Sequence, residues 1–128
     1  MAVGLGTTTL ANQWLNMLRG VAFTAPAATY VKLHTGDPGA AGTANPAAVT
    51  SRSAVTLAAA SGGAVALTGT QPSWSMTTSE TISYISIWDN STGGNFLWSA
   101  QLAVAKTVAD GDTLTLTTCG LSLSPLAA

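Results

Sequence analysis

Turn-forming residues recur along this chain at short intervals, and they divide most of it into stretches too short for stable helices. Four such turns contain glycine, which frees the backbone, beside other turn-forming residues such as Asp, Asn, Ser or Pro: 36–39 (GDPG), 61–63 (SGG), 89–94 (DNSTGG) and 110–112 (DGD). Between the turns, apolar side chains alternate with polar ones, which is the spacing of half-buried strands. The pattern predicts about eight short strands in an all-β fold, either a β-sandwich or a jelly-roll-like fold.

One stretch near the N-terminus follows a helical spacing instead. Within residues 9–19, one stripe of the predicted helix carries the apolar side chains Leu10, Trp14, Met17 and Leu18. A helix this short is not stable by itself, so we expect it to dock through Trp14 and Leu18 on the sheet or on a neighbouring subunit. The predicted organisation is an N-terminal arm with one short α-helix (1–20), followed by a single β-sandwich domain (21–128).

The segment 82–102 is predicted to form a hairpin that is unusually rich in aromatic side chains. Its first strand is apolar on both faces, because Ile85 and Ile87 alternate with residues that include Tyr84 and Trp88. Such a pattern is typical of a central strand that is covered on both sides. We predict that one face forms the core and the other belongs to a self-association surface. The residues assigned to this interface are Trp14, Tyr84, Ile85, Ile87, Trp88, Phe96 and Trp98.

Two further predictions concern the phase of the strands. Strict alternation in 95–102 places Phe96 and Trp98 on the same face. Near the C-terminus, the leucines change phase across Cys119 and Gly120, which predicts a β-bulge there.

Cys119 is the single cysteine of the chain, so no internal disulfide can form. We expect it to be a small buried thiol that forms no disulfide between subunits.

The chain carries very few charges. Charged residues make up 7% of it, against about 25% in an ordinary soluble protein. Little charge repulsion would keep a lone copy in solution, so we expect a surface that is largely covered in an assembly. The four basic residues stand singly, without the positive stripe that nucleic-acid binding uses. No apolar run approaches the roughly 20 residues of a membrane span. Neither nucleic acid nor membrane is therefore an expected partner.

Side chains that could carry catalysis are scattered. The single histidine, His34, falls at a strand end and is interpreted as a solvated or interface residue, because the sequence supplies no obvious nucleophile and orienting acid. Asp110 and Asp112 fit a tight turn better than a calcium loop, and no zinc motif is present. We expect no enzymatic activity, metal or cofactor. The alternative is a carbohydrate-binding module that uses the aromatic hairpin, although polar groups to orient a sugar are missing there.

Four motifs taken together resemble a family of small structural proteins of tailed bacteriophages. They are YVKLHTGDPGAAGTAN at 30–45, Arg52 at the start of a strand, ETISYISIWDNSTGGNFLWSAQL at 80–102, and KTVADGDTLTLTT at 106–118. Proteins of this kind, found mainly in phages of actinobacteria, are labelled minor tail, tail-fibre-like or capsid decoration proteins. The motifs are strands and turns, so the resemblance implies no catalytic residue.

The resemblance implies a non-enzymatic subunit of the outer virion. Such a subunit would act by self-association, as a homotrimer, and by packing against other virion proteins. Its expected location is the phage particle, and the host cytoplasm during assembly. Whether it belongs to the tail or decorates the capsid stays open at the level of sequence.

Overall fold

The computed structural model describes residues 3–124 and 127. The chain begins with a short helical segment, in which a π-helical turn η1 (Thr7–Ala11) runs into the α-helix α1 (Asn12–Met17). The strands of the described part are β1 (Thr29–His34), β2 (Ser53–Leu57), β3 (Ala64–Thr68), β4 (Ser73–Ser75), β5 (Glu80–Trp88), β6 (Phe96–Val108), β7 (Thr113–Thr115) and β8 (Gly120–Ser122).

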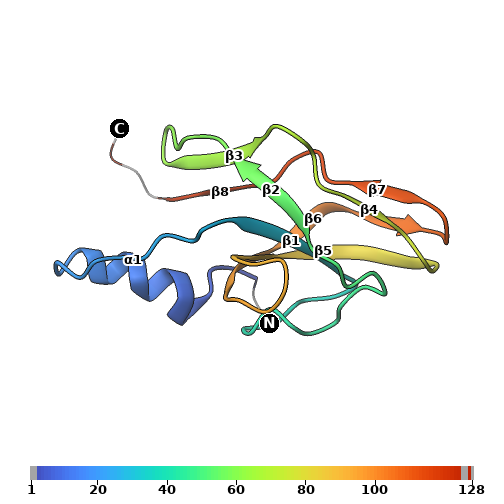
Figure 1. The fold of residues 1–128 in the computed structure, drawn as a ribbon, viewed down its shortest axis with the longest axis horizontal. Helices are drawn as coiled ribbons and strands as arrows, with labels where there is room; N and C mark the ends of the chain where they lie inside the picture. The colour runs from blue at the N-terminus through green and yellow to red at the C-terminus, as the bar shows by residue number, and fades with distance from the viewer. Residues whose placement is uncertain (1–2, 125–126, 128) are drawn as a thin grey trace.

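Six of these strands form one antiparallel sheet in the order β6-β5-β1-β2-β3-β8, and β4 pairs with β7 in a second, smaller sheet. The large sheet curls, because β2 crosses from the layer of β1 and β5 to the layer of β3 and β8 (Figure 1). The core lies between these layers and takes in side chains from both sheets, such as Ile87 and Trp74. This confirms the predicted all-β fold class with one short helix at the N-terminus.

The core face of the sheet follows directly from the alternation in the sequence. On β1, Val31 and Leu33 point to the same side, and they pair with Ile87 and Ile85 of β5. All four side chains are buried in one hydrophobic cluster. The predicted central strand is therefore β5, which lies between β1 and β6.

The opposite face of β1 and β5 is covered by the chain's own loops. Residues 36–50 fold back beneath the strands, where the Ala48 amide donates to the Glu80 carboxylate over 3.0 Å. Gly42 of this loop, with φ at +73°, lies so close to the Phe96 ring that a side chain there would overlap the ring. The two-sided apolar pattern of β5 is thus explained within one copy of the protein, and no second copy is needed to cover it.

A β-bulge in β6 separates two aromatic rings that alternation had placed together. Trp98 pairs with Ile87 and Phe96 pairs with Trp88, so one residue of β6, Leu97, is extra. Ile87 and Trp88 are consecutive and point to opposite faces, and their partners therefore do so as well. The prediction that Phe96 and Trp98 share a face is wrong. The bulge sends Leu97 and Trp98 into the core and leaves Phe96 against Trp88 on the other side, with ring centroids 5.7 Å apart.

The N-terminal arm docks on the outer edge of β6. The Gly6 amide donates to the Leu97 carbonyl over 2.6 Å, and the Ser99 amide donates to the Gly4 carbonyl over 2.9 Å. Leu10 is buried in the core. These contacts join the arm to the sheet through backbone as well as side-chain groups.

The helix itself differs from the prediction at its C-terminal end. Its last turn closes at Gly20, whose φ of +82° allows the Val21 amide to reach back to the Asn16 carbonyl. Trp14 is half-buried and packs on the core, as expected. Leu18 is 87% exposed, so it does not dock the helix on the sheet of its own copy, and docking on a neighbouring subunit stays a prediction. Only the first part of the helical stripe, with Leu10 and Trp14, contacts the core.

The phase change near the C-terminus has a different cause from the predicted bulge. β7 pairs with β4, whereas β8 pairs with β3, so the chain changes sheets between residues 116 and 119. Cys119 lies at this change and is buried, as the sequence predicts, and burial raises the pKa of its thiol.

Candidate functional site

A chain of buried hydrogen bonds links β1, β5 and the loop that covers them. His34 and Ser86 are both completely buried, with 2.7 Å between Nε2 of the ring and the serine Oγ. On its other side, His34 Nδ1 lies 2.8 Å from the Ala44 carbonyl oxygen, and the Trp88 indole N–H donates to Ser86 Oγ over 2.8 Å. A carbonyl can only accept, so Nδ1 carries the ring proton and Nε2 accepts from the serine hydroxyl.

This network resembles a nucleophile and its base in distance but not in surroundings. A catalytic serine needs access to substrate and a histidine oriented toward it, whereas here both groups are sealed and the third partner is a backbone carbonyl. Its effect is to hold the covering loop on the sheet, since Ala44 is bound through His34. The interpretation of His34 as a solvated or interface residue is therefore wrong. Ser86, its partner 52 positions away, carried no signal in the sequence.

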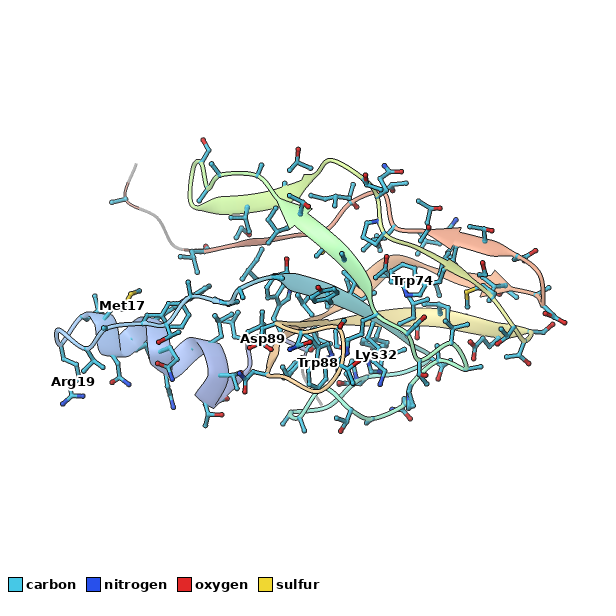
Figure 2. All side chains as sticks on the ribbon, in the orientation of Figure 1. Met17, Arg19, Lys32, Trp74, Trp88 and Asp89 are labelled. Carbon is cyan, nitrogen blue, oxygen red and sulfur yellow. The ribbon has the colours of Figure 1, made fainter. Side chains whose placement is uncertain are left out.

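Arg52 holds the turn of the aromatic hairpin over the same face. One guanidinium nitrogen donates to the carbonyls of Asn90 and Gly93, over 2.7 and 2.6 Å, and its central carbon lies 4.0 Å from the centre of the Trp88 ring. Figure 2 shows Trp88 and Lys32 on this side of the sheet and Trp74 on the opposite side. A cation over an indole face adds attraction to the hydrogen bonds. Partial burial lowers the pKa of Arg52, while Asp89 nearby opposes that shift.

The burial of His34 predicts a pH dependence of stability. Desolvation, the largest effect, lowers the pKa of its imidazole, and Lys32 lowers it further; the hydrogen bond to Ala44 acts in the other direction. As the pH falls, the unfolded chain binds a proton first, near its ordinary value of about 6.5. The stability that the neutral His34 ring contributes is therefore fully present above that pH. Below it, the free energy of unfolding decreases by about 1.4 kcal/mol per pH unit, until the pH reaches the pKa of His34 in the folded protein.

Urea denaturation between pH 8 and 5.5 measures this slope. His34 is the single histidine of the chain, so His34→Gln should be less stable throughout and should lose the slope in this window. A wild-type stability that does not change between these pH values would contradict the buried neutral ring.

The structure gathers most of the predicted interface residues in the interior instead of on a surface. Five of the seven are buried in the fold of a single copy: Ile85, Ile87, Trp88, Phe96 and Trp98. Trp14 and Tyr84 are half-buried. The five buried side chains therefore offer neither a free apolar face to a second copy nor open aromatic rings to a sugar.

Exposed apolar side chains gather instead at the end of the molecule that carries the arm. Between the arm and the strands β3 and β8 lies a cleft of about 360 Å³, whose lining is almost wholly apolar and includes Trp14, Phe23, Leu57, Val65, Leu121 and Leu123. Five of the most exposed large apolar side chains belong to this end: Leu123 lines the cleft, and Leu15, Met17, Leu18 and Val21 lie in the arm or directly after it. Figure 2 shows Met17 and Arg19 at the tip of this arm. We call the cleft and these five side chains the apolar end.

The sequence did contain a sign of the apolar end. Leu15 lies outside the helical stripe that carries Trp14 and Leu18, and a short helix with apolar residues on more than one side needs more than one partner. What the local pattern could not show is that Leu121 and Leu123, about a hundred positions later, complete the same surface.

Two negative observations concern the described residues. They contain no helix long and apolar enough to cross a membrane. They also bring together no group of three or more histidine, cysteine, aspartate or glutamate side chains that could hold a metal ion.

Comparison with known proteins gives one family. The family described as podophage GP4 fiber I protein gp80 matches residues 6–124. No curated protein matches the chain. A phage fibre family supports a structural role in the virion, with other virion proteins as partners, and gives no sign of catalysis. Since the match spans nearly the whole sequence, the chain belongs to the podophage GP4 fiber I protein gp80 family.

Proposed function

We propose that this protein is a non-enzymatic component of a phage tail fibre, and not a capsid decoration protein, and that it acts by self-association and by packing against other virion proteins. The fibre family supports the position on the tail. In this proposal the copies form a homotrimer, the arm of residues 1–20 takes part in the contact, and newly made chains collect in the host cytoplasm before assembly.

The observation that supports self-association is the apolar end. An isolated soluble protein rarely leaves an apolar cleft and a group of large apolar side chains together at its surface. Covering a side chain such as Leu18, which is 87% exposed, contributes about 1.5 to 3 kcal/mol. The chain also has little charge to desolvate at a contact, with charged residues at 7%.

The same chain supplies both halves of such a contact, which favours identical copies as partners. The arm projects from the body (Figure 1), and the cleft opens beside it. An arm of one copy placed on the cleft of the next is a head-to-tail contact, which closes into a ring when the rotation between copies allows it. A ring of three is the smallest closed arrangement beyond a dimer.

The test places a charge on the arm. Leu18→Asp should reduce the mass measured by light scattering from a multiple of 12.8 kDa to that of one copy, with an unchanged circular dichroism spectrum, because Leu18 makes no core contact. Asn12→Asp, which adds the same charge to an exposed position of the same helix, is the matched control and should leave the mass unchanged.

Two results would contradict the proposal. One is a wild-type protein that stays monomeric at micromolar concentration. The other concerns position: antibody labelling of intact virions should mark the tail, and a label spread over the capsid would refute the fibre assignment.

A further inference from the structure

The longest strand of the protein contains a stretch that leaves the sheet. β6 pairs with β5 in two blocks, and between the pairs Tyr84–Gln101 and Ile82–Lys106 it has four residues where β5 has one. These four residues, 102–105, pair with no other strand among the described residues. Their backbone N–H and C=O groups therefore do not belong to the regular ladder. An irregularity of this kind at a sheet edge bends the strand and interrupts its regular pairing.

This stretch is apolar and open to solvent. Leu102 is half-buried, the next residues up to Thr107 are exposed, and Val104 is exposed by 68%. Proteins usually protect an exposed edge with charges, proline or a covering segment. Residues 101–105 (QLAVA) contain neither charge nor proline, and a single lysine, Lys106, ends the stretch where it pairs with Ile82 of β5. The docked N-terminal arm covers β6 further back, where Leu5 pairs with Trp98.

A cleft runs alongside the same stretch. It has a volume of about 280 Å³ and lies between residues 102–106 of β6 and residues 114–118. Leu33, Trp74 and Ile85 form its floor, so core side chains can be reached from this edge. A segment that paired with β6 here would cover Val104 and this cleft together.

We infer that residues 102–106 of β6 pair with a β-strand of a second copy of this protein, namely with the same segment in antiparallel orientation. Backbone groups outside a ladder select an extended strand as their partner. The segment is compatible with itself: centred on Val104, the pairing sets Ala103 against Ala105 and Lys106 against Leu102, so no like charges oppose each other. A two-fold contact of this type is self-complementary.

The inference rests on the proposed self-association and adds a second contact to it. Five residues on each side bury much less than the roughly 1,200 Å² of a stable interface. A two-fold contact cannot form among the three copies of one ring, so it joins copies of two different rings. Three such contacts form together between two rings, which compensates for the small area of each.

Cross-linking tests the pairing directly. In the full chain with Cys119→Ser, Val104→Cys places two thiols opposite each other across the two-fold axis. Mild oxidation should convert most of this protein to a covalent dimer, at least ten times faster than the control Thr56→Cys, whose exposed side chain lies on β2. Equal rates for the two variants would overturn the inference.

A charge at the same position supplies the second measurement. Val104→Lys opposes two ammonium groups and should weaken association at least tenfold in sedimentation experiments, with an unchanged circular dichroism spectrum. If the variant associates as the wild type does, the β6 contact is refuted. In that case the loss of mass in Leu18→Asp would still stand, so the failure of this inference and that of the proposed function can be told apart.

Discussion

Replacing Ile87 with lysine is expected to unfold the protein rather than to dissociate an assembly. The side chain is completely buried, on the central strand β5, between Val31 of β1 and Trp98 of β6. The substitution removes apolar contacts and puts an amine where no acidic partner is found among the residues it pairs with. The combined cost is about 5 kcal/mol or more, which is comparable with the whole stability of a small domain. Circular dichroism of the purified variant should show loss of the β-sheet signal.

Val104→Lys is the matched comparison, because it introduces the same side chain at an exposed site of the neighbouring strand. It should remain folded. If Ile87→Lys stays folded and changes only the mass of the particle, Ile87 faces a second copy after all, and its burial within one copy is refuted.

The second large effect is expected at Gly42, in the loop that covers the sheet. An alanine Cβ at this position would lie 2.7 Å from Cγ of the Phe96 ring. The left-handed backbone, with φ at +73°, adds about 1 to 2 kcal/mol for any residue with a side chain, and overpacking of the ring adds about 1 to 3 kcal/mol. Gly42→Ala should therefore lower the free energy of unfolding by about 2 to 5 kcal/mol, measured by urea denaturation.

The same loop contains a control for this experiment. Gly39 has the same φ of +73°, but a Cβ there would meet Ala44 at 3.8 Å, an ordinary contact. Gly39→Ala should show the backbone cost without the overlap. If the two variants are equally stable, the loop does not pack on Phe96 as described.

The strands were predictable because their signals are local. The alternation of Val31 and Leu33 and the glycines of the turns depend on residues a few positions apart. Accordingly, β1 ends just before the predicted turn at 36–39, and β3 begins just after the predicted turn at 61–63. The two-sided burial of β5 could also be predicted, since both of its faces are apolar. Which part of the chain covers each face could not.

The errors share a physical cause, which is that the deciding partner is distant in sequence. His34 is buried because Ser86 and Ala44 satisfy its two nitrogens, and an isolated histidine at a strand end gives no hint of either. The bulge at Leu97 contains no glycine or proline, so strict alternation was the reasonable expectation there. The predicted interface rested on the two apolar faces of β5, on the low charge of the chain and on the resemblance to phage proteins. None of these distinguishes a buried core from a contact surface.

The docking of the N-terminal arm on β6 also sets an order for the events of synthesis. Gly4 and Thr9 bind partners that lie 95 and 87 positions later in the chain. At a translation rate of about 5 to 20 residues per second, the arm is synthesised roughly 5 to 20 seconds before β6. The first segment to be made is therefore among the last to find its place, and Leu10 and Trp14 stay uncovered during that interval.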